Sequence, residues 1–200
     1  MASIFDKISD KAGDTRKSST WYRNAVSSLG DSVTARKLYN QGKINQRPSL
    51  GRLNLFFYDP KFKETLPYYD TFPLVLPLEG FRGGFLGMNF HYLSPTIRFR
   101  LLNQLQRFAT NSKFDRTTRL DVSYQRVGGL ARVKQTIKKY LYSNVRSGFM
   151  RVDLQDAPTA VYLPVQQFKK RSASFVYGQS RGLQWQYLEA ELKYLVQILD

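Results

Sequence analysis

Three short apolar runs between Gly51 and Tyr92 constrain the fold of this chain most strongly. They span residues 53–58, 72–78 and 85–92, are rich in Phe, Leu and Tyr, and are separated by turn-forming residues. Short runs of this kind between turns are typical of β-strands. We therefore predict a small antiparallel β unit with short, bent strands, and an SH3-like barrel is one architecture that suits them.

Two prolines and a glycine-rich segment shape this unit. Pro73 and Pro77 lack the amide hydrogen that a sheet ladder needs, so their strand is expected at an edge or strongly bent. Residues 80–87 lack the pattern of a phosphate-binding loop and do not open a helix. We therefore predict a hairpin turn there. Arg82 lies at the tip of this turn, where its side chain is either simply solvated or in contact with a phosphate.

Two amphipathic helices are predicted beyond the β unit. Ser94 and Pro95 supply an N-cap and a first-turn proline for a helix of about 14 residues. Its apolar stripe consists of Ile97, Leu101, Leu105 and Phe108. The second helix has apolar residues at helical spacing, namely Leu130, Val133, Ile137, Tyr140 and Leu141.

The remaining segments complete an α+β fold class. Strand-like runs are predicted at 120–124, 149–154 and 160–164, in an order of β-rich unit, helix, strand, helix and strands. Residues 51–180 form the predicted core domain. Residues 1–50 form a basic N-terminal arm with short helices, and these either pack on the main domain or wrap a partner.

The C-terminal segment 181–200 is predicted to form a docking helix. Its leucines recur at spacings of four, three and four, which places them on one seam, and they are Leu188, Leu192, Leu195 and Leu199. The seam docks either on this chain or on a neighbouring subunit. In the N-terminal arm, Trp21 and Tyr22 are the candidate residues for docking a partner.

Charge points to a polyanionic partner. The chain of 200 residues carries 31 Lys and Arg against 15 Asp and Glu, a net charge of +16, with 42% hydrophobic and 14% aromatic residues. The nets are +5, +5 and +6 over residues 1–50, 51–120 and 121–200, so the charge is spread along a chain that can fold. We therefore expect a basic folded surface that attracts nucleic acid.

Several classes of protein are disfavoured. The chain has no cysteine, so disulfides, thiol nucleophiles and Cys-ligated metals are excluded. No segment looks like a signal peptide, and none approaches the ~20 apolar residues of a membrane span. We expect a cytosolic protein with no membrane partner.

Residues for catalysis are sparse. His91 is the single histidine, and a structural or surface role is favoured over that of a base or metal ligand. Asp59, Glu64 and Asp70 surround turn-forming prolines, and ordinary turn and cap chemistry is favoured over a nuclease-type site. We predict no catalytic residue, metal, cofactor or small-molecule substrate.

Cationic side chains are the residues that suggest a function. Lys and Arg residues cluster on both predicted helices and in a later polar stretch. Phosphate groups of DNA are their natural partners. For any one of these residues, the alternative is that it lies on an ordinary solvated helix face. The predicted DNA-binding residues are Arg98, Arg100, Arg107, Arg132, Lys134, Lys138, Lys139, Lys169, Lys170 and Arg171. No motif for reading base sequence is present.

The sequence also resembles a family of phage proteins. The resemblance is carried by residues 19–23, by GRLNLFFYDPK and LPYYDTFPLVLPL in residues 51–78, and by GFLGMNFHYL at 84–93, and it covers roughly Trp21 to Arg181. These segments resemble minor virion proteins of T4-like myoviruses, including marine phages, that are described as DNA end protectors. The resemblance implies a virion component on packaged DNA ends, or in the neck or tail, without catalysis.

Three hypotheses follow. The first is a virion or assembly protein, made in the host cytoplasm, that binds the phage DNA backbone nonspecifically near an end and docks other proteins of the neck, tail or baseplate. The second is a purely structural tail, neck or baseplate subunit whose basic surface docks acidic neighbours. The third and least favoured is an enzyme such as a nuclease or cell-wall hydrolase.

Overall fold

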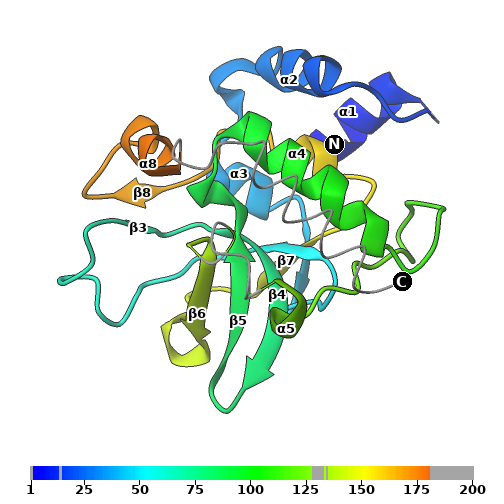
Figure 1. Ribbon diagram of the computed structural model, residues 1–200. Coiled ribbons are helices and arrows are strands. Elements are labelled where there is room, and N and C mark those ends of the chain that lie inside the picture. The colour runs from blue at the N-terminus through cyan, green and yellow to red at the C-terminus, as the bar shows by residue number, and fades with distance from the viewer. Residues whose placement is uncertain (1, 14, 128–132, 134, 181–200) are drawn as a thin grey trace.

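Six antiparallel strands form one sheet at the centre of the fold (Figure 1). The computed structural model describes residues 2–13, 15–127, 133 and 135–180. The order in the sheet is β1-β7-β2-β4-β5-β6, and the strands are Lys43–Asn45 (β1), Leu53–Leu55 (β2), Leu74–Phe81 (β4), Gly84–Asn89 (β5), Ile137–Leu141 (β6) and Phe149–Val152 (β7). A second, two-stranded sheet pairs Tyr69–Asp70 (β3) with Phe168–Lys169 (β8).

The central strands of the large sheet are buried on both faces. Along β4, Leu74 and Leu76 face the main core, whereas Val75 between them faces a second, smaller cluster. This alternation follows from the two-residue period of a strand. The smaller cluster is mostly aromatic and consists of Phe56, Tyr58, Val75, Phe85, Tyr140 and Phe149. The central strands therefore need apolar residues on both faces.

Helices cover the main-core face of the sheet. In Figure 1, α1, α2 and α4 lie together on one side of it. The α-helices are Ile4–Ala12 (α1), Ser19–Ser27 (α2), Ala35–Tyr39 (α3), Pro95–Leu105 (α4), Tyr124–Val127 (α5), Ala157–Ala160 (α7) and Ala173–Ser180 (α8). Short 3-10 helices are Gly30–Ser32 (η1), Phe90–Tyr92 (η2), Gln106–Phe108 (η3) and Tyr142–Asn144 (η4).

Side-chain caps start the N-terminal helices. Ser3 accepts a hydrogen bond from the amide of Asp6, whose carboxylate accepts one from the amide of Ser3, which makes a capping box for α1. At α2 and α3 the cap is a single hydrogen bond, which Ser18 accepts from the amide of Trp21 and Thr34 accepts from the amide of Lys37. Apolar residues of all three helices belong to the main core, including Ile8 and Leu38, which are fully buried. The first 40 residues therefore contribute directly to the core.

The structure confirms the α+β class and several predicted elements. The predicted helix over 95–108 is present as α4 continued by η3. The predicted hairpin turn joins β4 to β5, where Phe81 pairs with Gly84 and Gly83 takes a positive φ of 87°. Gly83 suits this turn because a side chain disfavours that backbone conformation.

The second predicted helix is wrong over Ile137–Leu141. These residues form strand β6, which pairs with β5. Ile137 packs against the main core, and Tyr140 belongs to the aromatic cluster on the opposite face. A strand with apolar residues on both faces does not show a regular alternation of apolar and polar residues, and the spacing of three between Ile137 and Tyr140 resembled that of a helix. Leu130, Arg132 and Lys134 lie outside the described residues.

Two predicted strands are also wrong. Residues 160–164 comprise the last residue of the short helix α7 and the irregular segment after it. In the run 120–124, only Leu120 forms an isolated bridge, with Ala109, and α5 starts at Tyr124. Both runs are apolar because they pack in the main core and not because they belong to a sheet.

The edge position predicted for the strand with Pro77 requires correction, whereas a strong bend was the other expectation for it. β4 lies inside the sheet and not at its edge, but it pairs with β2 only through Leu74 and Val75. Pro77 lies beyond this pairing, and the register toward β5 shifts between Pro77 and Glu79. The missing amide hydrogen is therefore tolerated. Among the described strands, β1 and β6 do not pair with each other, so closure into a barrel is not observed.

Candidate nucleic-acid interface

One face of α4 carries a row of polar and cationic side chains. Thr96, Arg100, Asn103 and Arg107 follow one another at intervals of four, three and four residues, which places them on the same side of the helix and of its extension η3. Arg100, Asn103 and Arg107 are exposed. The opposite side of α4 is buried in the main core. This burial fixes the direction in which the polar row points.

Two arginines from the N-terminal region join this row. Nη2 of Arg23 donates a hydrogen bond of 3.1 Å to Oγ1 of Thr96, and Nη2 of Arg16 donates one of 2.6 Å to Oδ1 of Asn103. Thr96 and Asn103 are seven residues apart, so the two anchoring points are about 10 Å apart along the helix. The resulting surface, which we call the α4 arginine ridge, consists of Arg16, Arg23, Arg100 and Arg107.

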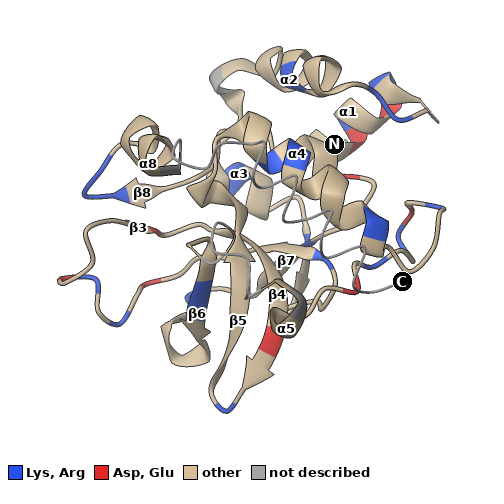
Figure 2. Ribbon diagram, in the orientation of Figure 1, with Lys and Arg blue, Asp and Glu red and all other residues tan. Residues whose placement is uncertain are grey.

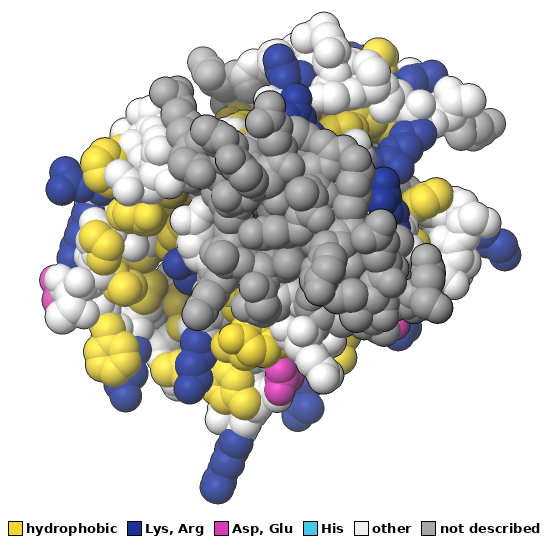
Figure 3. All heavy atoms as spheres, in the orientation of Figure 1, with side chains coloured by type: hydrophobic (Ala, Val, Ile, Leu, Met, Phe, Trp, Pro, Cys, Tyr) yellow, Lys and Arg dark blue, Asp and Glu magenta, His cyan; other side chains and the backbone are white. Residues whose placement is uncertain are grey.

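The ridge lies in a region with few carboxylates. The sequence has no Asp or Glu from Gly80 to Phe114, and Figure 2 shows Lys and Arg positions but no acidic position along α4. Within the described part of the chain, Arg16, Arg23 and Arg107 form no ion pair with a carboxylate. Figure 3 shows many Lys and Arg side chains on this side of the molecule and few acidic ones. Arg16, Arg23 and Arg107 are therefore available to an anion.

The expectation that Arg98 faces outward is wrong. Its side chain is completely buried. Its guanidinium donates hydrogen bonds to the carbonyl oxygens of Leu93 (2.8 Å), His91 (3.2 Å) and Val161 (3.3 Å) and to Oη of Tyr177 (2.7 Å). Burial lowers the pKa of Arg98. This arginine joins α4 to the segments around it and cannot reach a phosphate.

Lys138 and Lys139 lie on β6 rather than on a helix. Nζ of Lys138 is 4.5 Å from the centre of the Tyr92 ring, and burial lowers the pKa of this lysine. Lys139 is exposed, with Nζ 4.6 Å from the centre of the Phe81 ring. Of the two, Lys139 is the more accessible to a ligand.

The cationic block at 169–171 is partly engaged within the fold. Nζ of Lys170 donates hydrogen bonds to the carbonyl oxygens of Glu64 (2.8 Å) and Leu66 (3.0 Å). The guanidinium of Arg171 stacks over the ring of Phe175 at 4.9 Å. Lys169 is exposed on β8. The structure does not bring this block into the α4 arginine ridge.

The predicted docking residues have different positions. Tyr22 is buried in the main core of its own chain, so the expectation that it docks a partner is wrong, and Trp21 packs partly buried beside it. The C-terminal leucines at 188, 192, 195 and 199 lie outside the described residues.

The candidate catalytic residues do not form a common site. His91 and Asp70 are fully buried and bonded to each other, with 2.7 Å between Nδ1 and Oδ2, and burial lowers the pKa of His91. Asp59 pairs with Lys63 and Arg146 on the surface, and Glu64 is exposed elsewhere. Within the described residues no group of acidic or histidine side chains could hold a metal ion.

No helix of the described residues has the length and apolar character to cross a membrane.

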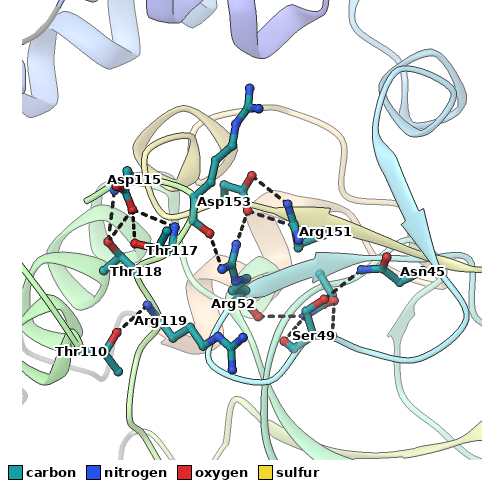
Figure 4. A network of polar contacts seen from close by, with 12 residues as sticks. Asn45, Ser49, Arg52, Thr110, Asp115, Thr117, Thr118, Arg119, Arg151 and Asp153 are labelled. Carbon is teal, nitrogen blue, oxygen red and sulfur yellow. Dashed lines mark hydrogen bonds and ion pairs between the residues drawn. The ribbon is translucent and has the colours of Figure 1, made fainter. Parts of the chain in front are cut away.

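Not every cluster of arginines is available to a ligand. Figure 4 shows Arg52 and Arg151 directed at the same carboxylate, that of Asp153. Arg52 forms an ion pair with Asp153 and donates to the carbonyl oxygen of Arg116, and Nε of Arg151 lies 3.0 Å from Oδ1 of Asp153. The side chains of Arg52 and Asp153 are only 7% and 8% exposed. Their charges are compensated inside the fold.

Sequence reasoning identified Arg100 and Arg107 but missed Arg16 and Arg23. Their contacts with α4 span 87 and 73 residues of sequence, so no local pattern reveals them. The acid-free stretch from Gly80 to Phe114 was the available signal, because it surrounds α4. A search for such stretches would have pointed to the face of α4 before the structure was known.

Comparison with known proteins places the chain in a family. The sequence profile of one family, described as phage T4 terminal DNA protecting protein, matches residues 2–181. The curated proteins and the solved structures gave no significant match. The family match covers α1 to α8 and therefore every residue of the α4 arginine ridge. The chain belongs to the phage T4 terminal DNA protecting protein family.

Proposed function

We propose that this protein binds the sugar-phosphate backbone of phage DNA near an end, without reading sequence, and protects that end as a non-catalytic component of the virion. The α4 arginine ridge is the observation that carries the proposal. The description of the family, terminal DNA protecting protein, supports the choice of DNA as the polyanion.

The dimensions of the ridge suit a DNA backbone. α4 has 11 residues and is about 16 Å long. Duplex DNA carries one negative charge per about 1.7 Å of its axis, so several phosphates lie within the length of the helix. Guanidinium groups bind phosphate through two parallel hydrogen bonds. The hydrogen bonds of Arg16 and Arg23 to α4 hold these side chains in place before DNA binds. This reduces the loss of side-chain conformational entropy on binding.

Other cations extend the proposed contact more weakly. Lys139, Lys169 and Arg171 are exposed on other elements. We assign them peripheral contacts with the same DNA, and Arg132 and Lys134 remain predictions because they lie outside the described residues. We exclude Arg98 because it is buried.

The proposed place of the protein is the virion, near the neck or tail, where packaged DNA ends meet other proteins. Docking of neighbouring neck, tail or baseplate proteins belongs to this proposal. A subunit that uses the ridge only to bind acidic protein neighbours is the competing function, and a DNA-binding measurement separates the two.

The first test measures binding to a fluorescent linear duplex by anisotropy at several salt concentrations. Three phosphate contacts, at Arg16, Arg23 and Arg107, predict a log–log slope of about −2.7 with salt, and the double variant Arg23→Gln, Arg107→Gln is expected to reduce its magnitude by about 1.8. The matched control, Lys61→Gln with Arg82→Gln, removes the same charge from two exposed positions outside the ridge. Equal effects of the two variants, or no binding at moderate salt, would contradict the proposal.

Absence of catalysis is tested separately. The purified protein is incubated with end-labelled linear duplex and Mg²⁺, and the expected result is that the labelled strand keeps its full length. Added exonuclease is then expected to be blocked by the wild-type protein and not by the Arg23→Gln, Arg107→Gln variant. Shortening of the strand by the protein alone would indicate a nuclease.

A further inference from the structure

The α4 arginine ridge ends at a cavity of about 500 Å³. The cavity lies between α1, the end of α4 with η3, the loop 112–115 and the start of α7. We call it the terminal pocket, and the lining residues that matter here are Arg16, Gln106, Lys113, Phe114, Asp156 and Thr159. Its volume lies in the range of about 300–1,000 Å³ that is usual for sites of small molecules. Arg16 belongs to both the ridge and the pocket.

An aromatic side chain held in an unusual backbone conformation forms part of the wall. Phe114 has a φ of 51°, in the left-handed region that residues other than glycine rarely adopt. Such outliers persist only where the surrounding structure imposes them. Here the following residue, Asp115, accepts hydrogen bonds from the amide and hydroxyl of Thr117 at 2.7 and 2.6 Å, and Figure 4 shows this turn. The guanidinium of Arg16 lies 5.7 Å from the centre of the Phe114 ring.

The pocket also contains hydrogen-bond acceptors that the described part of the chain does not use fully. Gln106 is only 8% exposed, and its Oε1 has no hydrogen-bond partner among the described residues. A buried polar atom without a partner is uncommon in a folded protein and calls for an explanation. The carboxylate of Asp156 lines the same cavity. These oxygen atoms favour a ligand that brings amino or hydroxyl groups.

We propose that the terminal pocket receives the last nucleotide of a DNA strand, with its phosphate at Arg16 and Lys113, its base against Phe114 and a donor group of the base or sugar at Gln106. This inference rests on the proposed function, because the ridge delivers the DNA to the pocket. It adds a physical reason for preferring an end over internal DNA.

The preference follows from size and from stacking. A duplex is too wide for the pocket, so only a nucleotide that has left the base stack can enter. Leaving the stack is easiest at an end, where a nucleotide has a neighbour on one side only, and a closed circle offers no such nucleotide. The cations Arg16 and Lys113 and the acceptor Gln106 match the chemical groups of one nucleotide, which has a phosphate at one end and a base with donor groups at the other.

The experiment compares a linear duplex with a closed circle of the same sequence as competitors for the full-length protein. The wild-type protein is expected to prefer the linear form. Phe114→Leu is expected to reduce binding of the linear form about tenfold, since loss of one stacked base has roughly this effect. Gln106→Met is expected to reduce it about fivefold, since one hydrogen bond contributes about 1 kcal/mol. Both variants are expected to leave binding of the circle unchanged.

Gln104→Met is the matched control. Gln104 is two residues from Gln106, and its Oε1 also lacks a partner among the described residues, but it does not line the pocket. This variant is expected to keep the preference for the linear form. Thermal unfolding of each variant checks that it folds.

The two proposals fail in different ways. Equal, salt-dependent binding of the linear and circular forms by the wild-type protein would overturn the terminal pocket and leave backbone binding intact. A pocket variant that weakens both forms equally would also overturn it. If the wild-type protein binds neither form, both proposals are overturned. If the double variant Arg23→Gln, Arg107→Gln loses binding of both the linear and the circular form, and the pocket variants do not, the result supports the ridge.

Discussion

The α4 arginine ridge and the Arg52–Asp153 network differ in what their arginines contact. Both gather arginines from distant parts of the sequence. In the network, Arg52 and Arg151 share the carboxylate of Asp153 in a largely buried setting (Figure 4). In the ridge, Arg16 and Arg23 donate to neutral side chains and remain exposed.

This difference separates structural from functional charge. A buried cation with a carboxylate partner is already compensated and contributes little to the external field, whereas exposed cations without carboxylates attract a polyanion. The net charge of +16 therefore overstates the charge available to DNA. The number of arginines in a sequence is therefore less informative than the knowledge of which arginines form ion pairs with carboxylates.

The largest expected effect comes from breaking the network. Asp153→Asn leaves Arg52 buried without its counter-ion and is expected to lower the free energy of unfolding by about 3–5 kcal/mol. Chemical denaturation measures this loss, and DNA affinity of the folded protein is expected to stay unchanged. Asp59→Asn, which removes a surface partner of Lys63, is the control and is expected to change stability little. Loss of DNA affinity in Asp153→Asn would show that the two regions are coupled.

A smaller effect is expected at Arg98, which belongs to neither region. Arg98→Met leaves the carbonyl oxygens of Leu93 and His91 and the hydroxyl of Tyr177 without their donor, so we expect a loss of about 2–4 kcal/mol in urea denaturation. Arg98→Lys keeps a charge but not the planar fork, and it is expected to recover only part of the loss. An Arg98→Met protein as stable as the wild type would show that burying the charge costs as much as its hydrogen bonds gain.

The position of Arg98 was readable from the sequence. Arg98, Leu101 and Leu105 are separated by three and four residues, so Arg98 lies on the apolar stripe of α4, whereas Arg100 is rotated about 200° away from it. The helix itself was predicted because its N-cap, proline and stripe are local signals. The burial of a charged side chain was missed because its hydrogen-bond partners come from several separate segments.

Non-local pairing limited the rest of the prediction. The strands β4 and β5 were found because a short turn joins them, whereas β6 was read as a helix because it carries apolar residues on both faces, at a spacing of three residues. Arg16 and Arg23 were not assigned to the interface because their partners on α4 lie far along the chain. Sequence reasoning thus found the elements with local signals, and the structure was needed to show which residues they bring together.

The smallest expected effect concerns Asp156, a carboxylate between the network and the terminal pocket. Burial and repulsion by Asp153 and Asp6 raise its pKa from 3.8 to about 6, and the cations Arg116 and Lys43 oppose the shift. Between these two pH values the folded state holds more protons than the unfolded state, so the stability contributed by this group decreases as the pH rises from about 4 to about 6.

Asp156→Asn removes this penalty because the amide stays neutral. We expect the variant to be more stable than the wild type by about 1–3 kcal/mol at pH 7.5 and by little at pH 4, as measured by thermal unfolding at both pH values. A gain that is equal at the two pH values would mean that the charge of Asp156 is not the cause. If the variant also loses its preference for linear over circular DNA, the penalty is kept in the wild-type protein because the carboxylate serves the terminal pocket.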